Sequence, residues 1–216
     1  MTPFRWQNCY ADVEASRHGK TIKSYLDDVI FPALGSLDRQ IDDLGRREEP
    51  WAMFERSDIE DVLRETKMAF ALAVQSIWER QLRSYLLGCA RDLRPKEQAS
   101  NKIERADWEG LRKLFRDLRG IRLEAFPSFE VLDTLWLLGN ACRHGDGASA
   151  VELARRCPDL WRPISSMPFS DQPLQVNHQP VGTMEVTVER LHGFVHAIVE
   201  FWQDAEYIYN ESIQSK

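Results

Sequence analysis

Apolar residues recur at three- and four-residue steps along most of this chain, which is the spacing of one face of an α-helix. The first such stretch covers residues 26–44, where leucine, isoleucine and valine side chains fall on one stripe. Pro32 lies inside this stretch and lacks the backbone N–H that an α-helix uses. We therefore expect the stretch to be kinked, or split into two helices near Phe31.

A longer helix follows, with apolar residues on one stripe for ten turns. Its start is predicted by Ser57 and Glu60, which have the spacing of a capping box. The stripe then continues over residues 58–93, and Pro95 is expected to end the helix. Residues 94–104 are mostly polar and are expected to form a connector.

Two further helices are marked by their terminal residues. Asp107 is a good N-cap, and Gly120 is a typical C-terminal stop. Ser128 is expected to cap the next helix, in which residues 135–138 are apolar on all sides. Such a helix should be central and buried, and it should stop at His144–Gly145.

The last part of the chain predicts two helices separated by an irregular segment. Ser149 and Glu152 form a second capping-box pattern, whereas residues 158–183 contain five prolines. Thr187 is expected to cap the final helix. The chain is therefore predicted to be an all-α protein, a helical bundle of five to six main helices with a Pro-rich irregular segment, in one domain over residues 1–216.

Composition narrows the functional classes. The net charge of −6 argues against sequence-independent coating of DNA, although it leaves room for a local basic site. The four cysteines are far apart and form no C-x-x-C pair, which is typical of reduced cytoplasmic thiols. No apolar run is long enough to span a bilayer, and no motif indicates a metal or another cofactor. We expect a cytoplasmic protein that has no membrane association and needs no cofactor.

The residue types best suited to catalysis gather in the segment 138–147, at the end of the apolar helix. Asn140 and His144 are four residues apart, so they project from neighbouring faces. Arg143 leans back over Gly139, since helical side chains point toward the N-terminus. Histidine exchanges a proton near neutral pH, and arginine holds a phosphate with two hydrogen bonds. These types suit phosphodiester cleavage without a metal, with His144 as general acid–base, Arg143 on the phosphoryl oxygens and Asn140 orienting either partner.

A purely structural explanation of this segment is also available. Cationic side chains in a last turn complement the helix dipole, and Gly145 is an ordinary stop. Asn140 would then only satisfy buried polar groups. Composition and spacing alone favour this structural explanation by about two to one.

The segment also resembles the signature of HEPN-type helical-bundle proteins, whose pattern is R-N-x-x-x-H at a helix end. Asn140 and His144 fall on the Asn and His of that pattern, whereas Gly139 occupies the arginine position. The resemblance implies a metal-independent endoribonuclease, usually a homodimer, that acts in a toxin–antitoxin pair or in antiviral defence. Either Arg143 substitutes for the missing guanidinium, or catalysis is lost. In the second case the chain is a non-catalytic interaction or regulatory module.

Three residues are candidates for contacts to the substrate: Glu79, Asp146 and Arg116. In the HEPN family a polar residue of an earlier helix often supports the motif, so Glu79 is the candidate to hold Arg143 or His144. A solvated charged face is the more frequent explanation of such a glutamate. Arg116 shares a helix face with Arg112 and Arg119, and this face is equally well explained as an RNA-binding patch or as an ordinary charged surface.

Overall fold

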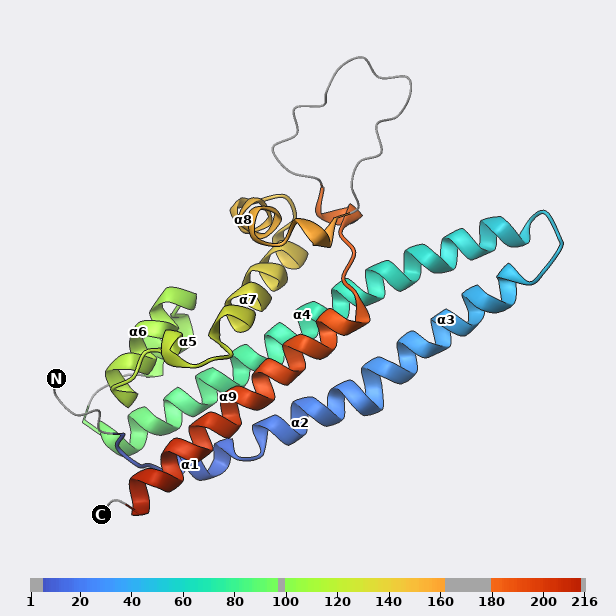
Figure 1. The fold of residues 1–216 in the computed structure, drawn as a ribbon. Helices are drawn as coiled ribbons and strands as arrows, with labels where there is room; N and C mark the ends of the chain where they lie inside the picture. Colours follow the sequence, from blue (N-terminus) through green and yellow to red (C-terminus); the bar gives the residue numbers. More distant parts are fainter. Residues whose placement is uncertain (1–5, 97–99, 162–179, 215–216) are drawn as a thin grey trace. The chain divides into compact units, whose positions relative to one another are not determined.

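The computed structural model describes residues 6–96, 100–161 and 180–214 (Figure 1). Over these ranges the chain forms helices and one isolated bridge between Trp161 and Met184, with no strand, so the predicted all-α class is confirmed. Most of the Pro-rich segment, residues 162–179, lies outside the described residues. The α-helices of the described ranges are α1 (Tyr10–Ala15), α2 (His18–Tyr25), α3 (Phe31–Gly45), α4 (Ala52–Leu93), α5 (Ser100–Arg105), α6 (Trp108–Arg119), α7 (Phe129–His144), α8 (Ala148–Arg156) and α9 (Val188–Gln214).

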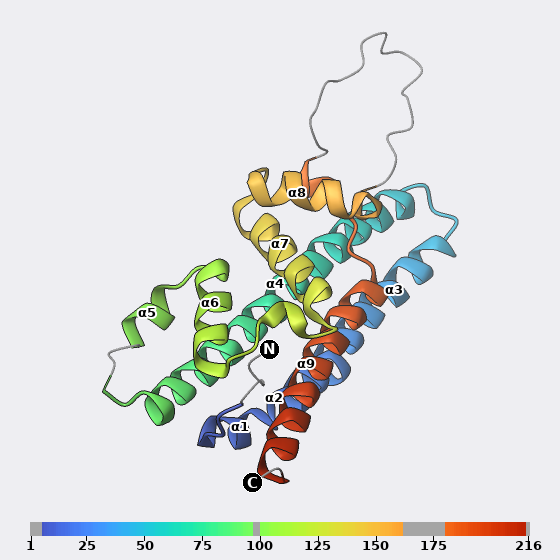
Figure 2. The ribbon, with the colours of Figure 1, turned by 60° about the vertical axis from the view of Figure 1, so that its left-hand side comes forward.

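The chain divides into two compact units. The first holds residues 1–26, 74–133 and 193–216, and the second holds residues 27–73 and 134–192. Helices α4, α7 and α9 contribute residues to both units, as the continuous ribbons in Figure 2 show. No helix of the described ranges is long and apolar enough to cross a membrane.

Aromatic rings from α4, α6 and α9 form the core of the first unit. Trp78 lies edge-on to Phe201, with ring centroids 4.8 Å apart, and edge-on to Trp202 at 5.7 Å. Tyr85 contacts Trp202 in the same way, and Phe115 lies 6.0 Å from Phe201. Such pairs add about 0.5–1.5 kcal/mol each beyond the burial of their area. These contacts hold three segments that are distant in sequence within one unit.

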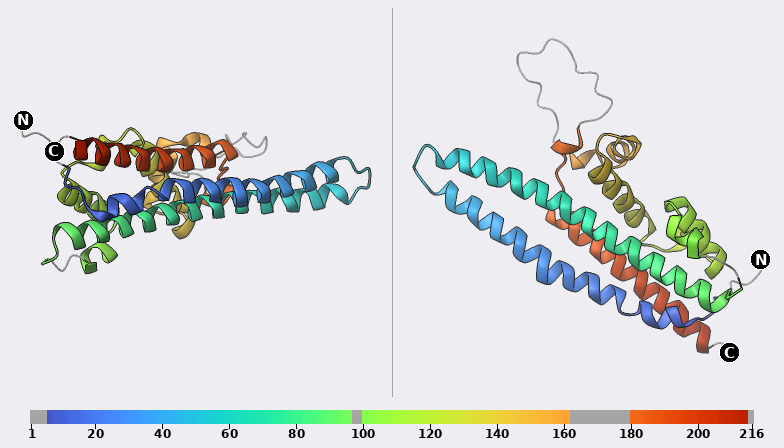
Figure 3. Two further views of the ribbon diagram at one scale, coloured as in Figure 1. Left: turned by 90° about the horizontal axis from the view of Figure 1, so that it is seen from below. Right: turned by 180° about the vertical axis from the view of Figure 1, so that it is seen from behind.

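In the second unit the stretch around Pro32 is interrupted as predicted. Helix α2 ends at Tyr25, a π-helical turn η1 (Leu26–Ile30) follows, and α3 starts at Phe31 with Pro32 in its first turn. The missing N–H of Pro32 is tolerated there, because first-turn N–H groups have no partner within the helix. Helix α3 then runs antiparallel to the first part of α4 as a long hairpin (Figure 3).

The predicted start of α4 is wrong. The helix begins at Ala52, so Ser57 and Glu60 lie inside it rather than at its N-terminus. Glu60 instead accepts a hydrogen bond from Arg56 at 2.9 Å, an i,i+4 pair on the helix surface. The Glu60 carboxylate, which the capping-box pattern predicts to bind a backbone N–H, is therefore bound to an arginine side chain instead. The predicted end at Leu93 is confirmed.

The connector predicted over residues 94–104 is also partly wrong, because α5 occupies its second half. Ile103 is completely buried in this short helix and provides the apolar contact that fixes it. The guanidinium of Arg83 donates to the backbone oxygens of Ile103 and, at 2.7 Å, of Ala106. A long-range side chain therefore satisfies carbonyl groups at the end of a helix that local sequence does not predict.

Other helix ends follow the predicted signals. The side chain of Asp107 accepts the N–H of Gly110 at 2.8 Å, and Gly120 has the left-handed φ of 74° that ends α6. The hydroxyl of Thr187 accepts the N–H of Arg190 at the start of α9. Polar caps and terminal glycines thus mark these boundaries correctly.

The cap of α8 is not the predicted one. Gly147 is the N-cap, and Ser149 lies in the first turn. Glu152 accepts hydrogen bonds from Arg155 and Arg156, which lower the pKa of its carboxyl to about 2. The carboxylate therefore binds arginines of the same helix instead of closing a capping box.

One buried histidine makes the stability of the first unit depend on pH. The ring of His18 packs against that of Trp202 at 4.7 Å, and burial lowers the pKa of His18 more than the charge of Glu14 raises it. The unfolded chain then binds the proton more readily, so stability falls as the pH drops below about 6.5. Thermal unfolding at pH 7.5 and 5.5 should show a larger decrease for the wild type than for His18→Gln. Equal decreases would contradict this prediction.

Candidate functional site

The end of α7 is exposed, whereas one stripe of the helix before it is buried. Leu135, Leu138 and Ala141 are completely buried in the second unit. Arg143 and His144 follow directly and are exposed in the last turn. The predicted exposed end with acid–base and cationic side chains is therefore observed. The predicted burial of the helix on all sides is not, because Trp136 and Leu137 are only half-buried and Val131 is exposed.

The start of α7 agrees with the prediction, although the cap does not use the predicted side chain. The helix begins at Phe129, and the backbone oxygen of Ser128 accepts the N–H of Leu132 at 3.1 Å. The Ser128 hydroxyl is buried and has no hydrogen-bond partner within the described residues. The backbone alone therefore places this end of the helix.

Asn140 and Gly139 lie one turn before the exposed pair. Asn140 is half-buried, and Gly139 is buried. Because a helix repeats every 3.6 residues, Asn140 and His144 lie on neighbouring faces, while Arg143 lies one turn after Gly139. The structure thus brings together three of the predicted site residues, Asn140, Arg143 and His144, within the final two turns.

A short glycine-containing loop leads away from His144. Gly145 has a left-handed φ of 73° and donates its N–H to the oxygen of Ala141 at 2.8 Å, which ends the helix. The carboxylate of Asp146, one of the three predicted substrate contacts, accepts the N–H of Val181 at 2.7 Å. One oxygen of Asp146 therefore fixes the loop to η4 (Val181–Thr183).

The neighbouring thiol is not a nucleophile at neutral pH. Burial raises the pKa of Cys142 to about 11, and the negative charge of Glu65 acts in the same direction. The thiolate is the reactive form of cysteine, so Cys142 is inert under ordinary conditions. Acid–base chemistry at this end of α7 is left to His144.

Glu79 lies in the first unit, whereas Arg143 and His144 lie in the second. Its carboxylate accepts hydrogen bonds from Arg83 at 2.6 Å and from Gln75 at 2.9 Å, both on the same helix. Arg83 in turn holds the end of α5. Glu79 therefore has an observed structural role, and its support of the motif stays a prediction.

The predicted basic face of α6 is partly neutralised by acidic side chains. Arg112 pairs with Glu124, and Arg116 lies 3.3 Å from the carboxylate of Asp117. Partial burial raises the pKa of Glu124, but the hydrogen bond from Arg112 lowers it, and the net shift is downward. Glu124 therefore stays charged. Arg116 is half-exposed beside a depression of about 190 Å³ lined by both signs of charge. The depression is lined by four basic and two acidic side chains, so this surface keeps a small excess of positive charge.

Arg119 does not belong to that face. It is buried and forms an ion pair with Asp12 at 2.9 Å, while its guanidinium lies 3.7 Å from the ring centroid of Trp6. The sequence offered one signal for this position, because Arg119 is four and eight residues after the buried Phe115 and Leu111. It therefore falls on the apolar stripe of α6.

Two cysteines that are distant in sequence meet beside Arg119. The sulfur atoms of Cys9 and Cys89 lie 3.4 Å apart, and their contact lowers the pKa of Cys9 and raises that of Cys89. The hydroxyl of Tyr85 donates to Asp12 in the same cluster at 2.7 Å. Sequence spacing gives no sign of this cluster, because its members are contributed by α4, α6 and the N-terminal segment.

The described part of the chain offers no arrangement of side chains for a metal ion. Among the described residues no group of three or more histidine, cysteine or acidic side chains is arranged to hold an ion. On α9, His196 pairs with Glu200 at 3.3 Å, and the ring of His192 stacks on Phe31. These contacts occupy the side chains whose spacing most resembles a ligand set.

Neither a protein-family model, nor a curated protein, nor a solved structure matches this chain. What the end of α7 can do is therefore derived from its own residues.

Proposed function

We propose that the end of α7 binds RNA and that His144 cleaves it without a metal, as the HEPN resemblance implies. The proposal is supported by one observation above all: a helix that buries one apolar stripe ends with Arg143 and His144 exposed in its last turn. An RNA phosphodiester suits this pair of side chains. Its phosphate is negatively charged, and the neighbouring 2′-hydroxyl carries the proton that a histidine can accept.

Each residue has a distinct role in this proposal. Arg143 donates two hydrogen bonds to the phosphoryl oxygens and substitutes for the arginine that Gly139 replaces in the HEPN pattern. Neutral His144 accepts the proton of the attacking hydroxyl. Asn140, half-buried one turn earlier, orients the imidazole or the substrate.

The resemblance also sets the cellular context of the proposal. A homodimer would bring two copies of the α7 end to one interface, and an antitoxin or another protein partner would restrain the activity in a toxin–antitoxin or antiviral system. The four cysteines are free thiols, which agrees with the reducing cytoplasm where RNA is translated.

RNA affinity tests the binding half of this proposal. Arg143→Ala should weaken binding of a fluorescein-labelled single-stranded RNA by about tenfold or more, because a hydrogen bond to a charged group contributes about 1.5–3 kcal/mol. The slope of log affinity against log salt should become shallower by about one. Fluorescence anisotropy over a range of salt concentrations measures both quantities.

Arg39→Ala is the matched control, since it removes an exposed arginine of the same unit. It should leave both the affinity and the salt slope within twofold of the wild type. Equal effects of the two substitutions, or none from Arg143→Ala, would remove the end of α7 as an RNA site.

A further inference from the structure

The turn between α3 and α4 and the first turn of α4 expose three large apolar side chains. Trp51, Met53 and Phe54 have exposed fractions of 48%, 66% and 65%, and they lie within four consecutive residues. Single exposed apolar residues are common, but a contiguous group marks a surface that is covered by a partner. We name these three residues the hairpin tip.

The hairpin that bears this tip carries the negative charge of the protein. Residues 27–73 contain twelve acidic and six basic residues, a net charge of −6. This equals the net charge of the whole chain, so the remaining residues are neutral in sum. The net negative charge is therefore concentrated on the hairpin and is not spread evenly over the protein.

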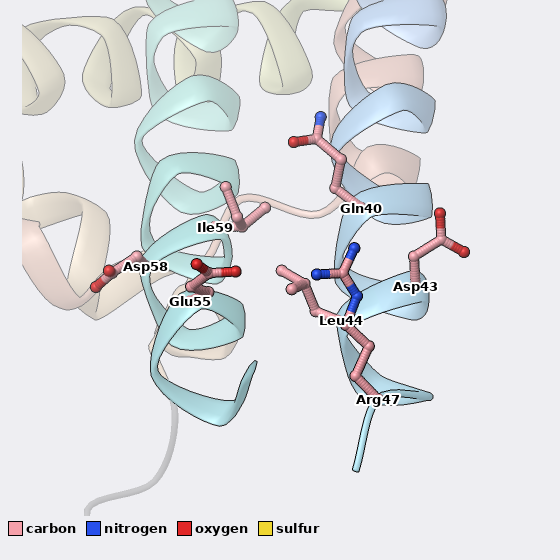
Figure 4. A pocket seen from close by; sticks show the side chains of 7 residues that line it. All are labelled: Gln40, Asp43, Leu44, Arg47, Glu55, Asp58 and Ile59. Atoms are coloured by element: carbon pink, nitrogen blue, oxygen red, sulfur yellow. The ribbon is translucent and has the colours of Figure 1, made fainter. Parts of the chain in front are cut away.

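A groove between α3 and α4 lies next to the tip. It has a volume of about 370 Å³, and Leu44 from α3 and Ile59 from α4 form its apolar part (Figure 4). Glu55 and Asp58 line the α4 side, and within the described residues neither takes part in an ion pair. Arg47 lines the α3 side, 6.0 Å from the ring of Trp51.

The apolar tip and the acidic charge around it limit which kind of partner can bind this surface. RNA and anionic lipid are repelled by the acidic field, and so is the same hairpin of a second copy. An apolar tip beside unpaired carboxylates is complementary to an amphipathic helix with a basic face. We propose that the hairpin docks a basic amphipathic helix of a partner protein, with its apolar face on Trp51, Met53 and Phe54 and its cations on Glu55 and Asp58. The inference does not depend on the RNA proposal, because it concerns another surface.

A defined probe tests this docking site on the full chain. We would use a fluorescein-labelled synthetic helix of leucine and lysine, about four turns long, and measure its affinity by fluorescence anisotropy. The triple variant Trp51→Ser, Met53→Ser, Phe54→Ser should weaken binding at least tenfold. The double variant Glu55→Gln, Asp58→Asn should weaken it about tenfold and make its salt dependence shallower.

The control for charge is Glu14→Gln with Glu206→Gln, which gives the same net charge through two exposed residues outside the hairpin. This control should bind the probe within twofold of the wild type, and all variants should keep the far-ultraviolet circular dichroism of the folded protein. Equal losses in the two double variants would mean attraction by total charge only and would overturn the proposal. It would also be overturned if a wild-type dimer disappeared in the triple variant, or if phosphatidylserine vesicles bound the tip.

Discussion

Replacing Asp12 by alanine should lower the free energy of unfolding by about 3–5 kcal/mol, because it leaves a buried guanidinium without its counter-ion. The side chain of Arg119 is completely buried, and that of Asp12 is 2% exposed. The two carboxylate oxygens accept from the same guanidinium nitrogen at 2.9 and 3.1 Å. Urea denaturation of the full chain, followed by circular dichroism, measures the loss.

The remaining contacts of Arg119 cannot replace that carboxylate. Its other terminal nitrogen donates to the backbone oxygen of Gln7 at 2.8 Å, and Nε has no hydrogen-bond partner within the described residues. The face of Trp6 attracts the cation, but such an interaction is worth at most a few kcal/mol. Tyr85 also loses the acceptor of its buried hydroxyl in the variant.

A double variant separates the ion pair from the packing. Asp12→Ala combined with Arg119→Met removes both charges and should be less destabilised than Asp12→Ala alone, because no uncompensated charge stays buried. Leu118→Ala, which truncates an apolar neighbour on the same helix, serves as a packing control. If Asp12→Ala were within 1 kcal/mol of the wild type, the guanidinium would not depend on this partner.

Local sequence signals predicted the helix ends that local contacts make. Asp107 caps α6 through its own first turn, and Gly120 and Gly145 adopt the left-handed conformations that end α6 and α7. Ser57 shows the limit of this reasoning, because a capping-box pattern also fits the interior of a helix when its glutamate has an arginine one turn away. The predicted start of α4 is therefore too late, and the sequence analysis does not predict the exposed tip at the true start of the helix.

Contacts between distant segments could not be predicted in the same way. The pairing of Asp12 with Arg119 joins residues 107 apart in sequence, and the contact of Cys9 with Cys89 joins residues 80 apart. Each requires the tertiary packing of the first unit, which periodicity does not supply. For Arg119, the apolar positions at three- and four-residue steps before it were the one available sign.

The candidate site was predictable because its features are local. A run of apolar residues followed by Arg143, His144 and a glycine predicts a buried helix with an exposed polar end. Helix α7 has the exposed end, but it buries only one stripe of its surface. The hydrogen bond from Val181 to Asp146 spans 35 residues and could not be foreseen. It adds a structural role to a residue that was expected only to contact the substrate.

His144→Ala should lower the rate of RNA cleavage by about 10²–10⁴-fold, which is the usual contribution of a general acid–base catalyst. In a metal-free reaction the nucleophile is the 2′-hydroxyl of the RNA itself. Neutral His144 accepts its proton as the oxygen attacks phosphorus, the bond to the 5′-oxygen breaks, and that oxygen takes a proton from water. The products are a 2′,3′-cyclic phosphate and a 5′-hydroxyl, which gel electrophoresis and end-labelling distinguish from other cleavage products.

Two controls test whether cleavage uses the 2′-hydroxyl and His144. A probe with a 2′-deoxy nucleotide at the scissile position should resist the wild-type protein, because it lacks the nucleophile. His196→Ala removes another exposed histidine, outside the proposed site, and should cleave RNA at the wild-type rate. Cleavage that is equal in the wild type and His144→Ala, or absent from both, would contradict catalysis at the end of α7. In the second case, RNA affinity that still depends on Arg143 would identify a binding module that has lost the reaction along with the arginine that Gly139 replaces.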